Sequence, residues 1–487
     1  MKQEEISVLA ANATRWSTIT EVIAKLISPV TSMILARLLT PEAFGVVATI
    51  NMVISFADMF TDAGFQKFLV QHEFKSKREL DQNTTVAFWT NLTISLVAWT
   101  IIAIFSEKIA ILVGNPGLGK VISIAAISLP LTSFSSIQMA YYKRNFDFRT
   151  LFFVRVIGIC VPLVVTVPLA FITRSYWALV IGTIVGNLVN ALVLTMRSEW
   201  KPSLYFSFSK LKEMFFFSWW ILLESVSIWL TSNIGIFIVG TYLSSYYLGL
   251  YKTSMTTTNQ IMGLVTSATS APLFTALSKL QNNEKEFKNV YFSYIQAVAV
   301  FIVPLGIGMF LYRNFLTMFL LGNQWMEAAN FIGLWSLISS VSLVLGTYCS
   351  GIYNAKGKPI FSFAVQIIYL IILIPILFVG ARSGFVVLYV GRSLSKLLFV
   401  AVQLVIMKLF FGFSPLKLIK QIIPAVICSG IMILVSLALK LVSSFMLWQV
   451  VCIFICIIVY FASMKLMFSK VLKDAFETLG FKLGKRR

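Results

Sequence analysis

The chain has 487 residues, of which 58% are apolar and 12% are charged, and its formal net charge is +21. This composition is too apolar for a soluble protein of such length, and it excludes most soluble enzymes. The single histidine, His72, stands in a basic loop and all five cysteines stand inside apolar segments, so no metal-ligand spacing is present. We therefore expect an integral membrane protein with no metal site and no cofactor.

Fourteen apolar segments follow one another along the chain, and each approaches the ~20 residues that cross a hydrocarbon layer of ~30 Å as a helix. They predict an all-α polytopic membrane protein. The predicted spans cover residues 17–38, 43–63, 85–106, 118–141, 150–171, 175–196, 214–239, 247–272, 290–311, 328–353, 360–380, 385–408, 420–442 and 447–467.

Lysine and arginine are concentrated in alternate loops. The loop after the second span holds Lys75, Lys77 and Arg78, whereas the loops after the first and seventh spans, 39–42 and 241–246, contain no basic residue. Cytoplasmic loops retain basic residues, so this alternation predicts that both termini are cytoplasmic. It also accounts for the net charge without nucleic acid, and it predicts contacts with anionic membrane lipids.

The longest loops cannot hold a folded catalytic domain, so any function must lie inside the helical bundle. The loop stretch from Phe65 to Leu80 mixes apolar and basic residues and predicts a helix lying on the membrane surface.

The chain also repeats itself at offsets of about 210 residues. Leu39 to Val46 matches Leu243 to Leu250, Tyr176 to Gly182 matches Phe385 to Gly391, and Tyr142 to Arg144 matches Tyr353 to Lys356. The matches occupy equivalent loops or spans, which predicts two six-helix lobes related by a pseudo-twofold axis along the membrane normal. We expect an N-lobe over 1–200, a C-lobe over 201–410, and two further helices with a basic cytoplasmic tail over 411–487. Parallel repeats of this kind are typical of transporters that rock two halves around a central site.

Several segments of the first 150 residues resemble one transporter family. The stretch from Leu35 to Gly45, LARLLTPEAFG, and its continuation at Asp62–Phe65 and Leu69–Gln71 are similar to the signature of bacterial polysaccharide exporters. Arg144 to Arg149 resembles a further motif of the family, with Phe146 where leucine is common. These proteins are the O-antigen and colanic-acid type flippases of the multidrug/oligosaccharidyl-lipid/polysaccharide exporter superfamily.

The resemblance implies a flippase in the bacterial inner membrane rather than an enzyme. Its implied substrate is an undecaprenyl-diphosphate-linked oligosaccharide for cell-surface polysaccharide such as O-antigen or capsule, moved from the inner to the outer leaflet by alternating access. Other polysaccharide assembly proteins are possible partners. A lipid II flippase and a drug or cation antiporter of the same superfamily remain alternatives, although twelve helices are usual for the antiporters. A membrane-embedded polymerase or glycosyltransferase would need a large loop with paired acids, which the sequence lacks.

Ionisable residues inside membrane spans are costly, so they are the first candidates for function. In this chain they are Glu21, Lys25, Arg37, Asp58, Asp62, Arg155, Glu224, Lys252, Arg392 and Lys396. Arg37 and Lys252 stand near the outer ends of their spans, where a structural or snorkelling role is sufficient.

At a rise of ~1.5 Å per residue from the ends of their spans, three cations reach the middle of the membrane: Lys25, Arg392 and Lys396. An anionic diphosphate would relieve the repulsion between Arg392 and Lys396, which share one helix face, so we expect these three residues to bind the substrate. The alternative is that Glu21 and Glu224 neutralise the cations as fixed buried ion pairs.

The remaining candidates are expected to control the transport cycle. Glu21 and Glu224 lie deep enough to bind a coupling ion, Na⁺ or H⁺, and the sequence leaves the choice between them open. Asp58, Asp62 and Arg155 lie within about two turns of the inner surface, where they could form an ion pair that closes an inner gate. Interfacial snorkelling is an equal alternative for these three.

Overall fold

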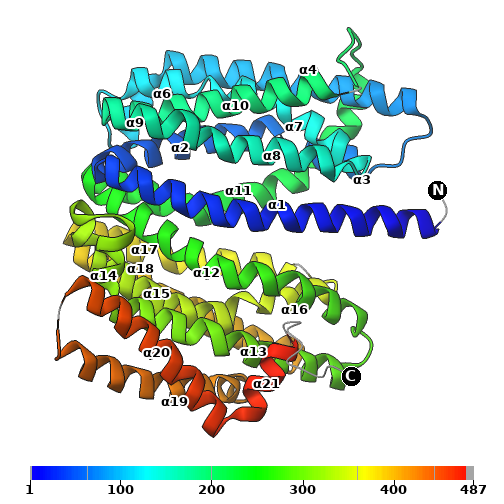
Figure 1. Ribbon diagram of the computed structural model, residues 1–487. Helices are drawn as coiled ribbons and strands as arrows, with labels where there is room; N and C mark the ends of the chain where they lie inside the picture. The colour runs from blue at the N-terminus through cyan, green and yellow to red at the C-terminus, as the bar shows by residue number, and fades with distance from the viewer. Residues whose placement is uncertain (1–2, 63, 199, 359, 444, 479–487) are drawn as a thin grey trace. The chain divides into compact units, whose positions relative to one another are not determined.

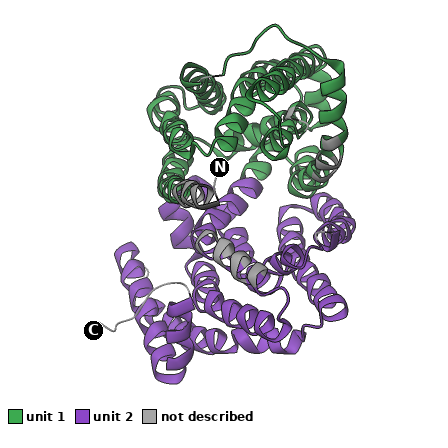
Figure 2. Ribbon diagram, turned by 90° about the vertical axis from the view of Figure 1, so that its right-hand side faces the viewer, with its two compact units in different colours: residues 1–249 green, residues 250–487 purple. Residues whose placement is uncertain are grey.

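The computed structural model describes residues 3–478, apart from 63, 199, 359 and 444 and some side chains within the helices. The described residues form α-helices with short 3₁₀ and π segments, and no strand is present among them (Figure 1). This agrees with the all-α prediction. The helices gather into two compact units, residues 1–249 and 250–487 (Figure 2).

The first unit holds the first eleven α-helices and the start of the twelfth. They are α1 (Gln3–Leu38), α2 (Pro41–Asp62), α3 (Phe65–Gln71), α4 (Lys77–Ile104), α5 (Ser106–Leu112), α6 (Gly119–Ala125), α7 (Ser128–Arg144), α8 (Phe148–Val161), α9 (Val167–Thr173), α10 (Trp177–Arg197), α11 (Phe208–Tyr242) and α12 (Ser245–Lys279). Helix α7 packs against α3, α4 and α10, while α1 packs against α8. One apolar core, around Phe68, Phe88 and Met214, lies toward the predicted inner end, and another, around Ile50, Ile122 and Leu129, lies toward the predicted outer end.

The second unit holds the rest of α12 and the remaining helices. They are α13 (Glu284–Leu311), α14 (Arg313–Leu320), α15 (Ala329–Ser342), α16 (Cys349–Ala355), α17 (Ile360–Ser383), α18 (Phe385–Phe411), α19 (Pro415–Lys440), α20 (Met446–Met467) and α21 (Ser469–Thr478). Helix α13 lies at the centre, because it packs against α15, α19 and α21. Its buried residues, among them Tyr291, Ile295 and Ile302, form the largest part of the apolar core.

Every predicted span corresponds to a helix or to a pair of consecutive helices. Thirteen of the described helical segments are long and apolar enough to cross a membrane. The eighth predicted span falls on α12, which is not among the thirteen although its 35 residues would extend about 50 Å. Its first half carries Lys252 and the polar run from Thr256 to Gln260, which lower its hydropathy. The structure thus supports a multi-pass helical protein, and the count of fourteen stays a prediction.

Two spans are interrupted by single π-helical turns. One turn, Pro162–Thr166, joins α8 to α9, and the other, Leu343–Thr347, joins α15 to α16. Proline lacks the backbone N–H that an α-helix needs, which explains the irregular turn at Pro162.

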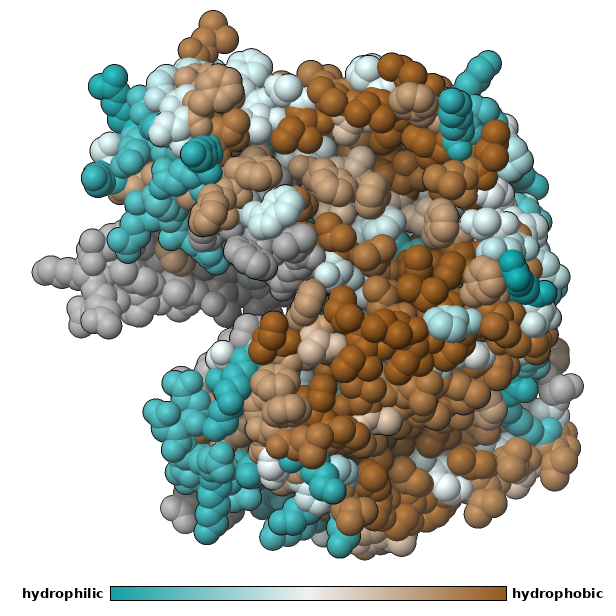
Figure 3. Space-filling model, turned by 180° about the vertical axis from the view of Figure 1, so that it is seen from behind, coloured by the Kyte–Doolittle hydropathy of each residue, from teal (hydrophilic) through white to brown (hydrophobic). Residues whose placement is uncertain are grey.

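The surface of the helices matches a membrane environment. Large apolar side chains are exposed along α17 to α20, including Ile371, Val386, Leu434 and Phe454. Figure 3 shows apolar side chains along the middle of the helices and hydrophilic ones gathered toward their ends. The backbone N–H and C=O groups of these exposed segments are hydrogen-bonded within the helices, so they need no water as a partner.

The compact units differ from the lobes that the repeat predicts. The first unit extends to residue 249 and includes α11, which the predicted C-lobe of 201–410 would contain. The second unit includes α19 and α20, which were expected as separate appended helices. Packing defines the units and sequence repetition defines the lobes, so the predicted boundaries remain predictions.

Reporter fusions can test the predicted orientation. Cytoplasmic reporters fused after Lys77, Lys210 and Lys285 should be active, and periplasmic reporters fused after Ser244 and Asn323 should be active, because basic loops resist translocation. A reversed reporter in the middle of the chain would contradict the fourteen-span topology.

Candidate functional site: two cavities and a cluster of buried cations

Two glycines allow the first turns of α2 and α12 to touch through their backbones. A Cβ on Gly45 would overlap the carbonyl oxygen of Ser245, and a Cβ on Gly249 would overlap that of Pro41. The contact is reciprocal, since Ser245 and Pro41 each lie one helical turn before the glycine of their own helix. Gly45 and Gly249 are also equivalent in the first pair of repeated segments. The contact between these two helices is therefore reciprocal, and the symmetry of the two lobes stays a prediction.

Asn115 ties neighbouring loops to this crossing. Its Nδ2 donates a hydrogen bond to Thr49 Oγ1 at 3.1 Å, and its Oδ1 accepts one from Ser245 Oγ at 2.5 Å. Next to it, Gly114 has a φ of +76° and lies directly against the carbonyl of Gly240. Three loops that the charge pattern predicts to be external are thus held together in the first unit.

Alanine at Gly45 should destabilise the protein, because its Cβ would meet backbone that cannot move aside. We expect a cost of about 1–3 kcal/mol or more, typical of overpacking. Gly430→Ala is the matched control, since a Cβ at Gly430 meets nothing within 4 Å. Thermal unfolding of the purified variants should show a lower midpoint for Gly45→Ala alone, and equal midpoints would contradict the crossing.

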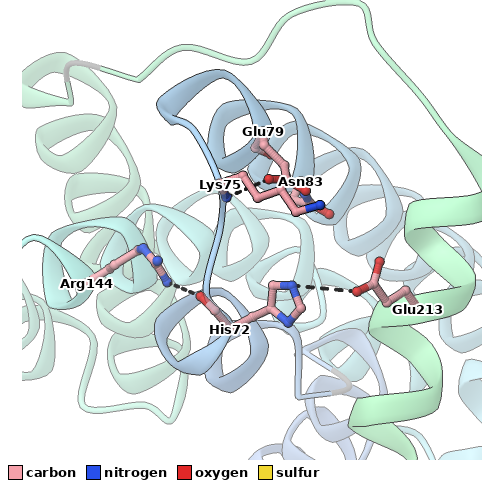
Figure 4. Close-up of polar contacts among 6 residues, drawn as sticks. All are labelled: His72, Lys75, Glu79, Asn83, Arg144 and Glu213. Atoms are coloured by element: carbon pink, nitrogen blue, oxygen red, sulfur yellow. Dashed lines mark hydrogen bonds and ion pairs between the residues drawn. The ribbon is translucent and has the colours of Figure 1, made fainter.

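Arg144 caps the short helix α3 at the predicted inner end (Figure 4). Its Nη1 donates hydrogen bonds to the carbonyl oxygens of Leu69 at 2.8 Å, Val70 at 3.3 Å and His72 at 2.7 Å. The guanidinium also lies 4.6 Å from the ring centroid of Phe74. The last carbonyls of a helix have no partner within the helix, and a cation there is favourable.

His72 links the end of α3 to α11. Its ring stacks on Phe68 at 4.6 Å, and its Nε2 lies 3.6 Å from Glu213 Oε1 (Figure 4). Phe65, Phe68 and Leu69 of α3 are buried. The stretch from Phe65 to Leu80, predicted as one surface helix, is divided: α3 ends at Gln71 and is packed into the bundle, residues 72–76 are not helical, and α4 begins at Lys77.

A cavity of about 710 Å³ lies in the first unit, between α1, α7, α8 and α10. Its polar lining consists of Ser17, Thr20, Glu21, Ser28, Thr31, Ser32, Ser135, Lys143, Arg155 and Asn190. The polar residues of α1 in this lining, from Ser17 to Ser32, recur every three, four or seven positions, so they form one face that is about 22 Å long. A polar face of this length on a membrane helix is unfavourable unless it lines a wet cavity. We call it the polar cavity.

The polar cavity brings together two of the predicted residues. Glu21 and Arg155 are exposed and contribute a negative and a positive charge to the lining, beside the exposed Lys143. Lys25 is half-buried on α1 and is not among the lining residues. Sequence reasoning did not single out Lys143 or the hydroxyl groups of α1. Their helical spacing was the signal that could have found them.

Asn190 supplies a polar group to the same cavity. Its Oδ1 is buried and has no hydrogen-bond partner, and it lies 3.0 Å from where a Cβ on Gly158 would be. Glycine at 158 therefore leaves the room that the amide occupies. A buried acceptor without a partner is costly, so it favours binding of a donor such as a hydroxyl group.

Asp58 is held by hydroxyl groups. Its Oδ1 accepts hydrogen bonds from Thr132 Oγ1 at 3.0 Å and from Thr61 Oγ1 at 3.2 Å. Arg155, its predicted gate partner, lines the polar cavity instead. The side chains of Asp62 and Glu224, also predicted to act in gating or ion coupling, lie outside the described residues.

Arg392 and Lys396 lie together in the second unit, around Trp335. Arg392 is 7% exposed, and its Nη1 donates to the hydroxyl of Tyr369 at 2.9 Å. The Lys396 Nζ donates to Ser339 Oγ at 2.6 Å and lies 3.7 Å from the ring centroid of Trp335. Arg392 lies 5.4 Å from the same ring. The predicted pair is confirmed as neighbours, but sequence reasoning missed the aromatic residues that hold it.

No described carboxylate of the second unit pairs with these two cations. An aromatic face attracts a cation, and the attraction is worth about 2 kcal/mol or more where water is excluded. The Nε of Arg392 and the Nε1 of Trp335 are buried without acceptors. The cluster thus has spare donors and a surplus of positive charge.

A second cavity, of about 400 Å³, lies between α12, α13, α14, α19 and α20 in the second unit. Its lining is apolar apart from Tyr312, Tyr460 and Cys456. The hydroxyl of Tyr460 donates to the carbonyl of Val300 at 2.7 Å, and that of Tyr312 accepts from Ser436 at 2.9 Å. These hydroxyl groups are satisfied by the protein, so the cavity suits an apolar ligand. We call it the apolar cavity.

Residues 34–330 match the model of a family described as "Polysaccharide biosynthesis protein". The chain belongs to this family. The match covers more than half of the chain and confirms the resemblance seen in its first 150 residues.

Curated relatives agree with this assignment. "Lipopolysaccharide biosynthesis protein WzxC" of Escherichia coli K12 is 21% identical over 380 residues, which cover 76% of this chain and 75% of WzxC. "Succinoglycan biosynthesis transport protein ExoT" of Rhizobium meliloti is 26% identical over 321 residues, covering 66% and 64%. The chain is thus a membrane protein of polysaccharide biosynthesis, and the expectation that it is not an enzyme is confirmed.

Solved structures show the same fold. The lipid II flippase MurJ in an inward closed conformation superposes with a TM-score of 0.75 at 15% identity, covering 93% of this chain and 99% of MurJ. An inward-facing multidrug transporter of the MOP superfamily gives a TM-score of 0.52 at 13% identity, covering 84% and 98%. These likenesses establish the fold, which is the one predicted for the superfamily.

Proposed function

We propose that the protein is a flippase that moves an undecaprenyl-diphosphate-linked oligosaccharide from the inner to the outer leaflet of the bacterial inner membrane by alternating access. The polar cavity of about 710 Å³ is the observation that carries this proposal. Its volume lies in the range of roughly 300–1,000 Å³ that is usual for ligand sites, and its hydroxyl, amide and charged groups suit a hydrated saccharide.

The apolar cavity supports the same substrate class. A lipid-linked saccharide has a polar head and a long hydrocarbon tail, and the two need surroundings of opposite character. The apolar cavity offers such surroundings to a hydrocarbon chain, and it is partly built by α19 and α20.

The charged residues receive the following proposed roles. Lys396 and Arg392 attract the diphosphate, with Lys25 as a third contact. The half-buried Lys396 carries the more accessible charge, while Tyr369 holds Arg392 in place. Glu21 and Glu224 bind the coupling ion, Na⁺ or H⁺. Asp58, Asp62 and Arg155 change partners during gating. In this conformation Asp58 accepts hydrogen bonds from Thr132 and Thr61.

Flipping should depend on the polar lining of the cavity. We expect Arg155→Gln to lower the transport rate by roughly ten- to a hundredfold, since a charge-assisted hydrogen bond contributes about 1.5–3 kcal/mol. Arg149→Gln is the matched control, because Arg149 is an exposed arginine of the same helix outside the lining. Asn190→Ala tests a second residue of the lining, and Thr183→Val is its control, because Thr183 is an exposed residue of α10 outside the lining.

The measurement is the exposure of a labelled undecaprenyl-diphosphate oligosaccharide to an added glycosidase in proteoliposomes. Equal rates for Arg155→Gln and Arg149→Gln would remove the polar cavity from the transport path. Failure of the wild-type protein to flip this lipid, while it flips lipid II or exports cationic dyes, would overturn the proposed substrate.

The cationic cluster can be tested separately. Arg392→Ala should weaken binding of the diphosphate headgroup by roughly ten- to a hundredfold, and Arg392→Lys should have an intermediate effect because it keeps the charge but loses the planar fork. Surface polymer would be measured in a flippase-deleted strain at matched membrane abundance. Normal export by Arg392→Ala would contradict the role in binding. If Arg392→Ala instead lowers the yield of folded protein, and removal of Glu224 or Glu21 as well restores that yield, Arg392 only neutralises a carboxylate.

A further inference from the structure

A third, smaller cavity lies in the second unit where α13 begins and where α16 and α18 end. Its volume is about 180 Å³. Three lysines contribute to its lining, Lys288, Lys356 and Lys358, together with one carboxylate, Glu284, and four phenylalanine rings. All of these residues stand in or beside loops that the charge pattern predicts to be cytoplasmic. We call it the lysine cavity.

The aromatic rings hold the lysines in place. The Nζ of Lys288 lies 5.5 Å from the ring centroid of Phe413, and that of Lys356 lies 4.7 Å from that of Phe287. The rings of Phe287 and Phe413 are both buried and pack edge-to-face at 6.4 Å. Lys358 lies 5.9 Å from the ring of Phe411. The floor of the cavity is therefore rigid, and the ammonium groups stand above it.

The positive charge of the cavity exceeds its negative charge. Glu284 Oε2 lies 3.6 Å from Lys288 Nζ, and Lys356 Nζ donates to the carbonyl oxygen of Gln281 at 2.9 Å. Each ammonium has three donors, so these contacts leave most of the donors available. Lys358 is exposed. Three like charges around one small cavity repel each other unless an anion lies between them.

A glycine lies beside Lys288 of the cavity. Gly412 ends α18 with a φ of +64°, a conformation that favours glycine. A Cβ at this position would lie 3.4 Å from Lys288 Nζ, so a longer side chain would compete for the space beside the ammonium.

We propose that the lysine cavity binds the phosphate of an anionic lipid headgroup at the membrane surface. Lysine suits phosphate as a compact charge, and lysines at the cytoplasmic surface attract anionic lipids. Leu409 and Phe410, at the end of α18, expose large apolar side chains next to the site, where acyl chains would lie. The proposal concerns a site separate from both larger cavities and does not depend on the flippase activity.

The test measures lipid binding to the purified full-length protein by native mass spectrometry, with phosphatidylglycerol as the anionic probe and phosphatidylcholine as the zwitterionic control. The variant is Lys288→Gln/Lys358→Gln, which leaves Lys356 bonded to Gln281. The matched control is Lys285→Gln/Lys417→Gln, which removes the same charge from exposed lysines outside the cavity. Thermal unfolding verifies that both variants are folded.

We expect the cavity variant to bind phosphatidylglycerol at least about tenfold more weakly than the wild type, and the control variant to differ from it less than about twofold. Competition by inorganic pyrophosphate distinguishes the sources of the phosphate. Displacement of phosphatidylglycerol by pyrophosphate shows that the phosphate group itself is recognised, and absence of displacement shows that the lipid is required. If the cavity variant loses pyrophosphate binding but keeps phosphatidylglycerol binding, the site belongs to a free phosphate and the proposal is overturned. The proposal is also overturned if the cavity variant and the control variant bind phosphatidylglycerol equally well.

Discussion

An ionised side chain inside a membrane-spanning bundle loses its water, and the protein must replace that hydration. The described residues show three replacements. Arg392 and Lys396 rest on the faces of aromatic rings and on hydroxyl groups. Asp58 accepts hydrogen bonds from two threonines. Glu21 and Arg155 face a cavity large enough to hold water. In these places the cation or carboxylate is stabilised without an opposite charge bound to it.

This choice of partners has a consequence for transport. A cation that is neutralised by a carboxylate gains little from a second anion, whereas one held by an aromatic ring keeps its charge and its spare donors. The cluster around Trp335 thus keeps buried donors without acceptors. Likewise, Glu21 and Arg155 line the polar cavity.

The segments that carry the family resemblance hold the ends of the first unit. The segment that ends at Gly45 forms the reciprocal backbone contact with Gly249, and Arg144 caps the helix that contains Leu69 and Val70. Few other residue types could make either contact. The first requires that the glycines have no side chain, and the second requires the several N–H donors of the Arg144 guanidinium. The polar cavity, in contrast, is lined by serine, threonine and charged residues that lie mostly outside these motifs. The motifs that identify the family thus report on its architecture more than on its substrate.

The sequence by itself determined the class of the protein, because apolar length and the alternation of basic loops follow from the thickness and the electrostatics of a membrane. It also predicted that Arg392 and Lys396 would share a helix face, since residues four apart always do. Only the tertiary structure decided what surrounds them. The partners Trp335 and Tyr369 come from two other helices, α15 and α17, and no periodicity within α18 links them to Arg392. For the same reason the placement of Arg155 with Glu21 rather than with Asp58 could not be predicted, because it depends on which faces of α1, α2 and α8 pack together.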